Sequence, residues 1–169
     1  MRNWTLLLLL LCASVASGAT IQSNGGQNLD WSSSSTWEGE VVPGNGDDVV
    51  IGSGSQVVVN NQTAVTVASV SVSAGGPSGN EPASLLVAGT LTITSALSVI
   101  GGTPSAEPAT GGFATLTLTG TVIAGSIQIV GGAGSSFGSG GDAGIWLDDD
   151  AATLKSAGNV SLSSQFSTF

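Results

Sequence analysis

The sequence predicts an all-β fold, a short right-handed parallel β-helix with three strands per coil. Two observations support this prediction. Segments of the chain repeat at a spacing of about 26 to 31 residues, and apolar residues alternate with Ser and Thr inside each repeat. Gly-rich stretches separate the alternating segments, and glycine allows the tight turns that the corners of a coil need. A β-sandwich or jelly roll built from similar hairpin pairs is the alternative fold.

The repeat is clearest between residues 85 and 132. Leu85–Leu91 matches Leu116–Val122, and Leu97–Gly102 matches Ile127–Gly132, while a degraded third copy begins at Ile145. Alternation with a period of two residues predicts the following strands: 85–88, 91–93, 97–100, 116–119, 121–124 and 127–130. We expect the first and fourth of these to lie in register on adjacent coils, with four side chains pointing inward: Leu85, Val87, Leu116 and Leu118.

Residues 1–18 have the composition of a secretory signal peptide. Arg2 precedes the apolar run Leu6–Leu11, and small residues lead to a cleavage expected before Ala19. The run is too short to span a bilayer permanently, so we expect no membrane span in the mature chain. The expected localisation is therefore secreted, either free outside the cell or at its surface.

Removal of this segment leaves a chain with few groups for chemistry. Cys12 is the one cysteine and leaves with Arg2, so Lys155 then stands against 11 acidic residues, and there is no histidine. Such a chain does not bind nucleic acid by neutralising phosphates or bind an anionic membrane surface. Only a carboxylate mechanism would be available to an enzyme. We therefore expect a non-catalytic protein without a cofactor.

A second informative pattern lies near the start of the mature chain. Asn28–Trp31 and Thr36–Ile51 contain two tryptophans, a Val-Pro-Gly turn and an Asp pair that leads into a strand. This stretch continues through Gln56–Val59 and Val65–Val67 and resembles the opening of secreted β-solenoid modules, including G8-like domains and the β-helical passengers of bacterial adhesins. The resemblance implies a tryptophan-bearing cap on the first coil. Those families include adhesins, receptors and enzymes, and no catalytic motif of theirs matches here.

The residues themselves support the same cap. The end of a solenoid exposes an apolar cross-section that must be covered, and Trp31 and Trp37 are large enough to cover it. The alternative is that either side chain packs under a loop. The expected organisation is a signal peptide at 1–18, an N-terminal cap at 19–48 and a β-solenoid domain at 49–169.

The run Asp148–Asp150 is the densest group of charges in the chain. We interpret it as a solvated turn between two strands. The alternatives are a calcium site that uses Asp148 and Asp150, and a carboxylate pair for glycoside cleavage. Elsewhere, the sequons at Asn61 and Asn159 are candidate glycosylation sites.

Threonines form a further pattern. Thr90, Thr92 and Thr94 are expected to face three threonines of the next unit, Thr117, Thr119 and Thr121. A flat threonine array on a solenoid can order water, as ice-binding proteins do. The alternative is ordinary outward positions on a β-surface, where Thr has a high propensity.

The C-terminal segment suggests a joint between subunits. Val160–Phe169 alternates like a strand up to the last residue and contains no charge, Pro or Gly. Natural sheets normally protect such an edge against pairing with another chain. We expect assembly through this segment, with the strand around Ile21 as the complementary edge of the next subunit and with four contact residues: Val160, Leu162, Phe166 and Phe169.

These observations predict a structural function. We expect a self-assembling subunit of a surface or secreted fibril, whose partner is a second copy of itself bound head to tail. The alternative is an adhesin-like carbohydrate-binding module, with glycans as partners, either bound or covalently attached. Further alternatives are a carboxylate-based glycosidase or lyase and an ice-binding protein.

Overall fold

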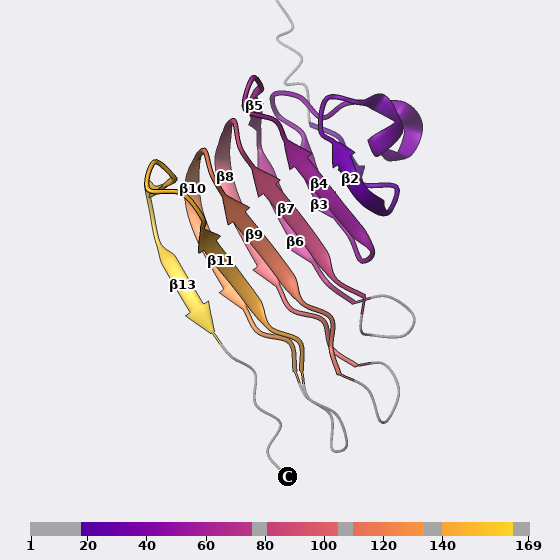
Figure 1. Cartoon of the computed structure of the whole chain (residues 1–169), viewed down its shortest axis with the longest axis vertical. Coiled ribbons are helices and arrows are strands. Elements are labelled where there is room, and N and C mark those ends of the chain that lie inside the picture. Colours follow the sequence, from indigo (N-terminus) through magenta and orange to yellow (C-terminus); the bar gives the residue numbers. More distant parts are fainter. Residues whose placement is uncertain (1–17, 76–80, 105–109, 134–139, 164–169) are drawn as a thin grey trace, which may run out of the picture.

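The computed structural model describes residues 18–75, 81–104, 110–133 and 140–163. These residues form a parallel β-solenoid of about four turns, whose strands stack as rungs along one axis (Figure 1). Every pairing between two of its strands is parallel. The predicted fold class is confirmed. The β-sandwich alternative is wrong, because a sandwich of hairpins would pair neighbouring strands antiparallel.

The described part of the chain contains short strands that alternate between two sheets. Sheet I has the strand order β11-β9-β7-β4-β2, and sheet II has the order β1-β3-β6-β8-β10-β12, with β5 paired to β8 and β13 paired to β10. The bounds are β1 (Thr20–Gln22), β2 (Gly26–Asp30), β3 (Asp48–Ile51), β4 (Ser55–Val59), β5 (Ala64–Val67), β6 (Ser69–Ser73), β7 (Ala83–Val87), β8 (Thr90–Ile100), β9 (Ala114–Leu118), β10 (Thr121–Val130), β11 (Ala143–Leu147), β12 (Thr153–Ser156) and β13 (Val160–Ser163).

Each complete coil contributes three strand segments, as predicted. One segment lies in sheet I, and the other two lie in sheet II, where they join end to end as β8 and β10. The first part of β8 pairs with β5 and its second part with β6. In the same way, β10 pairs with β12 and then with β13. The strands predicted at 91–93 and 97–100 are therefore two parts of one long strand.

The core consists of columns of inward-facing aliphatic side chains. Leu85 lies in register with Leu116, and Val87 with Leu118, on the adjacent strands β7 and β9. All four side chains are fully buried. Side chains alternate between the two faces of a strand, so the residues between them face outward. The predicted register is thereby confirmed, and the alternating sequence pattern is its cause.

Two glycines allow the coils to stack closely at their corners. Gly120 lies at the turn from β9 into β10, and a Cβ atom there would overlap the carbonyl oxygen of Gly89 in the coil before. Gly141 precedes β11, and a Cβ atom there would overlap the carbonyl oxygen of Gly112. The Gly141 N–H also donates to the carbonyl of Gly102 at 2.9 Å. A larger residue at either corner would force successive coils apart.

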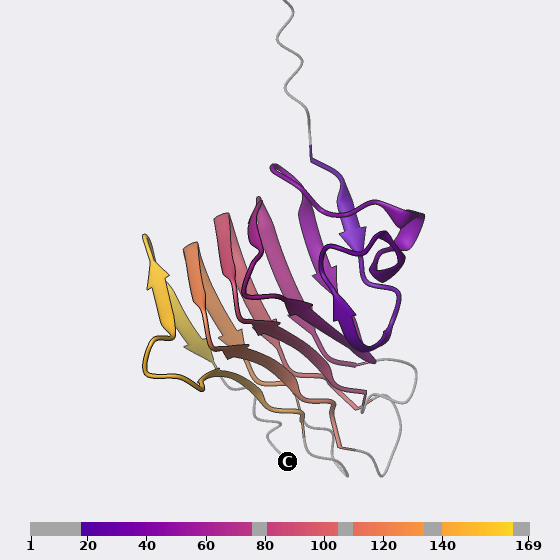
Figure 2. The same ribbon diagram turned by 45° about the horizontal axis from the view of Figure 1, so that its top comes forward.

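The N-terminal end carries the predicted tryptophan-bearing cap. Two short 3₁₀ helices, η1 (Ser34–Thr36) and η2 (Glu38–Glu40), lie at this end of the stack (Figure 2). Trp31 and Trp37 are buried in the same apolar cluster as the strands. Their rings meet edge to face with centroids 4.9 Å apart, and Trp37 Nε1 donates to the Trp31 carbonyl at 2.8 Å. The segment 19–48 also contributes β1 and β2 to the two sheets.

Candidate functional site

The C-terminal end of the solenoid exposes the apolar cross-section of its last coil. Leu147 and Leu162 occupy inward positions, in register with Leu118 and Ile129, yet their side chains are 59% and 73% exposed. Val160 is 56% exposed at the next inward position of β13. Among the described residues no later strand covers them. We call Leu147, Val160 and Leu162 the C-terminal face. Phe166 and Phe169, also predicted to act in assembly, lie outside the described residues.

The opposite end of the molecule is built differently. Ile21 on β1 is only 5% exposed, because it pairs in register with Val49 and lies under the cap. β1 nevertheless forms the N-terminal edge of sheet II. Val41 and Val42, which follow η2, are 56% and 38% exposed. The edge of β1 is partly occupied, because Ser23, directly after β1, forms an antiparallel bridge with Trp37. Among the described residues, this end therefore has a covered core and a partly paired strand edge, whereas the C-terminal end has an uncovered core and an unpaired last strand.

A groove marks the N-terminal end beside β5. It has a volume of about 350 Å³ and runs between Trp31, Val42, Pro43 and the edge strand Ala64–Val67. It lies beside the chain that leads from η2 to β3, which contains no strand to pair with β5. At this groove, one edge of β5 in sheet II is unpaired among the described strands and lies next to apolar side chains.

β1 and β13 belong to one column of strands. The pairings run β1-β3-β6, then through the second parts of β8 and β10 to β13. The inward positions of this column begin at Ile21 and end at Val160, with aliphatic residues between them. The structure therefore places the predicted assembly residues of both ends in the same column, at its two edges.

The acidic run lies in a turn. Asp148, Asp149 and Asp150 are exposed between β11 and β12. Asp149 Oδ1 accepts the N–H of Ala151 at 2.9 Å, which is the local hydrogen bond of an Asx turn. Among the described residues, no group of three or more His, Cys, Asp and Glu side chains has a metal-binding arrangement. The hydrogen bond gives Asp149 a local role in this turn.

Asp30 has a structural role that sequence analysis did not identify. Its Oδ1 accepts the backbone N–H and the hydroxyl of Ser32, at 2.8 and 2.7 Å, and its Oδ2 accepts the amide of Asn60 at 2.8 Å. The hydrogen bond from the Ser32 hydroxyl contributes most to lowering the pKa of Asp30, followed by that from the Ser32 N–H. Asp30 thereby ties the start of the cap to the turn after β4.

Both predicted glycosylation sites lie at the surface. Asn61 is exposed in the turn between β4 and β5, and Asn159 is exposed immediately before β13. The carbonyl of Asn159 accepts the N–H of Ile127 at 2.9 Å, so its backbone is part of the rung. A glycan on Asn159 would stand beside the C-terminal face.

The predicted pairing of threonines is partly wrong. Thr90 lies in register with Thr121, which lies in register with Thr153, so one column of threonines does cross sheet II. Thr117 instead lies on β9 in sheet I, beside Leu86, because the corner at Gly120 separates it from β10. The column beside the threonines is Thr66, Thr92, Ile123 and Lys155, so the surface is not a flat threonine array.

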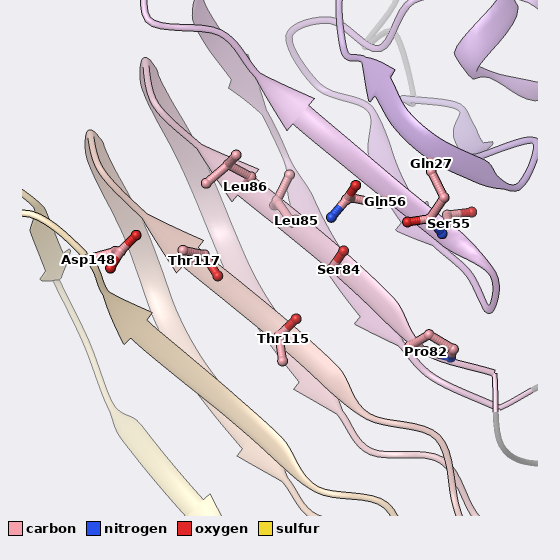
Figure 3. Close-up of a pocket in the computed structure, with 10 residues that line it drawn as sticks. All are labelled: Gln27, Ser55, Gln56, Pro82, Ser84, Leu85, Leu86, Thr115, Thr117 and Asp148. Carbon is pink, nitrogen blue, oxygen red and sulfur yellow. The ribbon is translucent and has the colours of Figure 1, made fainter.

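The outer face of sheet I forms a shallow groove of about 450 Å³ (Figure 3). Its lining side chains come from neighbouring strands, among them Gln56 on β4, Ser84 on β7, and Thr115 and Thr117 on β9. Asp148 lies at its C-terminal end. All of these side chains except Asp148 are half-buried. Leu86 and Pro82 also line it, so the groove is a mixed surface, with a row of polar side chains beside apolar ones, that crosses the rungs.

Trp146 is the functional candidate that the sequence analysis missed. It lies on β11 in register with Thr117, on the same outer face, and it is 64% exposed. The signal was present, because Trp146 falls between the inward-facing Ile145 and Leu147 in an alternating segment. Tryptophan is enriched at binding interfaces because its large ring can stack on a ligand, so the outer face of sheet I and Trp146 form a second candidate site.

Comparison with known families identifies the architecture. The model of the G8 domain matches residues 36–140, which is more than half of the chain. The chain belongs to the G8 domain family. The matched region runs from the cap to the corner before β11, so it contains β3 to β10 but neither β1 and β2 nor the C-terminal face. Searches of curated proteins and of solved structures return no match. In the described parts of this G8 protein, no helix has the length and apolarity needed to cross a membrane.

Proposed function

We propose that this G8 protein is a non-catalytic extracellular structural protein that polymerises head to tail into a surface or secreted fibril. The observation that supports this function is the C-terminal face, where Leu147, Val160 and Leu162 occupy inward positions of the last coil and remain exposed. Inward positions of every preceding coil are covered by the next one. The first strand of a second copy would cover Val160 in the same way, and contact with the rest of that copy's N-terminal end would shield Leu147 and Leu162.

The two ends are suited to a parallel joint. Since β1 and β13 are opposite edges of one column, a shift along the solenoid axis brings β13 of one copy beside β1 of the next. The strands would then be parallel, like all the strand pairs within the chain, at the usual separation of about 4.8 Å. Val160 would meet Ile21 at the inward position. Contacts between different surfaces that do not close into a ring generate fibres.

The energetics indicate that side chains alone do not hold the joint. Burying three aliphatic side chains that are already partly covered contributes at most about 2 kcal/mol each. Association costs roughly 4–15 kcal/mol in lost translational and rotational freedom. Backbone pairing at the open edges and contact with Val41 and Val42 must supply the difference. We therefore expect assembly that depends strongly on concentration.

Charge opposes this assembly. The full chain has a formal net charge of −9, with acidic residues near both ends, such as Glu38 and Asp149. Salt screens such repulsion over a Debye length of about 8 Å at physiological ionic strength. Filaments should therefore form more readily as salt is raised, the opposite of an assembly held by ion pairs.

Static light scattering and electron microscopy of the mature chain, beginning at Ala19, test the proposal. We expect a scattering mass that rises with concentration at physiological salt, together with filaments. Leu162→Lys should abolish both, because it places a charge in the joint, while Ser161→Lys on the outward side of β13 should leave both intact. A wild-type protein that stays monomeric at high concentration would refute the fibril function.

The secretory route belongs to the same proposal. Residues 1–17 of the predicted signal peptide at 1–18 lie outside the described residues. Mass spectrometry of protein secreted from a eukaryotic host should give Ala19 as the first residue and glycans at Asn61 or Asn159. Retention of the intact N-terminus inside the cell would contradict the extracellular assignment.

A further inference from the structure

The outer face of sheet I carries two parallel rows of side chains that run along the solenoid axis. Strand pairing aligns Gln56, Ser84 and Thr115 in one row, which ends at Gly144 on β11. The second row runs from Val58 through Leu86 and Thr117 to Trp146. With about 4.8 Å between strands, the three steps from β4 to β11 span about 14 Å. Figure 3 shows the members of both rows that line the groove.

The first row supplies hydrogen-bonding groups that can both donate and accept. A glutamine amide and a serine or threonine hydroxyl each have this dual character. Ser84, Thr115 and Thr117 form no side-chain hydrogen bond with another described residue, and Gln56 uses only its Oε1, which accepts the N–H of Asn28 at 3.2 Å. The matching ligand groups are also donor and acceptor at once, as hydroxyls are.

The second row ends in an aromatic platform that reaches over the first. A Cβ atom added at Gly144 would lie 3.4 Å from Nε1 of Trp146. The indole therefore leans across Gly144, in line with Thr115, and the missing side chain at Gly144 leaves it room to do so. The side chain is 64% exposed, so most of the indole is available for stacking.

Charge restricts the ligand further. Among the described residues that line the groove, Asp148 is the one charged side chain, and Lys155 lies on β12 in the other sheet. An anionic polymer would meet repulsion from Asp148 and from the negative chain as a whole. A peptide strand would pair with a sheet edge instead of crossing the rungs of a sheet face.

We propose that the outer face of sheet I binds a neutral glycan chain, which lies across β4, β7, β9 and β11 with a sugar ring stacked on Trp146. A sugar ring has hydroxyls around its rim and C–H groups on its faces, so it matches a polar row that ends in an aromatic plane. The site adjoins the fibril joint at β11, where Trp146 precedes Leu147, but most of it lies elsewhere: Thr115 and Thr117 are on β9, an interior strand of sheet I. Binding of this kind would attach the protein to a cell wall or an extracellular polysaccharide.

Affinity electrophoresis of the mature full-length chain tests this site. The probes are neutral polysaccharides (mixed-linkage β-glucan, laminarin, xyloglucan, galactomannan and arabinoxylan) and two acidic ones (alginate and polygalacturonate). We expect at least one neutral probe to retard the protein and the acidic probes not to. Trp146→Ala should weaken the binding at least tenfold, and Thr115→Val and Thr117→Val at least threefold each. The matched control Thr92→Val, on the outer face of sheet II, should bind like the wild type.

Tryptophan fluorescence gives an independent readout. Trp31 and Trp37 are buried, so a blue shift on adding the binding polysaccharide would come from Trp146 and should be lost in Trp146→Ala. Repeating the titration in the Leu162→Lys background separates binding from polymerisation, and the affinity should be unchanged there. Failure of all five neutral probes, stronger retardation by the acidic probes, or wild-type affinity in Trp146→Ala would each overturn the proposal.

Discussion

The two cap tryptophans should respond differently to the same substitution, Trp→Phe. Trp37 and Trp31 are 0% and 1% exposed, and their rings pack against each other. Trp37 Nε1 donates to the Trp31 carbonyl at 2.8 Å. Trp31 Nε1 is buried and has no hydrogen-bond partner among the described residues. Each substitution removes one indole N–H and leaves a smaller ring, so the hydrogen bond is the main difference between the two variants.

The magnitude follows from that difference. Trp37→Phe deprives a buried carbonyl of its donor, which costs about 1–3 kcal/mol. Trp31→Phe removes a buried N–H that is already unpaired, so it relieves a penalty of similar size and offsets part of the loss of packing. We therefore expect Trp37→Phe to be less stable than Trp31→Phe by about 2 kcal/mol or more, given these penalties.

Urea unfolding measures the difference in stability between the two variants. It should be followed by far-UV circular dichroism, because both substitutions change the tryptophan fluorescence. The midpoint of Trp37→Phe should fall well below that of Trp31→Phe at the same m-value. Equal midpoints, or a lower midpoint for Trp31→Phe, would show that the hydrogen bond between the two tryptophans does not hold the cap together.

Three other predictions concern the core, the acidic turn and the effect of pH. Leu118→Asp buries a charge without a partner and should prevent folding, whereas Ser98→Asp on the outer face of β8 should give a folded circular dichroism spectrum. Replacing Asp148–Asp150 with asparagines should change the free energy of unfolding by less than about 1 kcal/mol, and a Tm that rises with calcium would contradict the turn. The lowered pKa of Asp30 means that its contribution to stability is complete above its ordinary value of 3.8 and is lost as pH falls through the lower folded-state value. Asp30→Asn should therefore be less stable than the wild type at neutral pH, and this difference should shrink in urea titrations at acid pH.

The strands and their register were predictable because one sequence pattern determines both. Leu85 and Leu116 stand 31 residues apart, each begins an alternating segment, and a slip of one residue would turn the apolar side chains outward. The corners were harder to place. Alternation continues from Thr115 to Thr121 without a break other than Gly120, so the sequence did not show that Thr117 and Thr121 lie in different sheets.

The candidate sites were predictable only in part. The exposed Val160 and Leu162 were found because an alternating strand with no following rung has no cover. Trp146 was missed because its exposure depends on Gly144 and on the position of β11 at the end of sheet I, neither of which a local pattern reveals. The hydrogen bonds of Asp30 join residues far apart in sequence, such as Asn60, and no repeat connects them.

The unequal ends of the solenoid give its unfolding a direction. Each coil touches mainly its neighbours, so a coil opens most easily when one neighbour is missing. Trp31 and Trp37 pack against the first coil and stabilise it. Among the described residues, β13 pairs with another strand along one edge only. Amide hydrogen exchange should thus be fastest at β13 and slow progressively toward β4. A second subunit bound at this end would protect β13, the rung that exchanges fastest. The amide exchange rate at Leu162 would therefore measure the fraction of subunits whose C-terminal end is free.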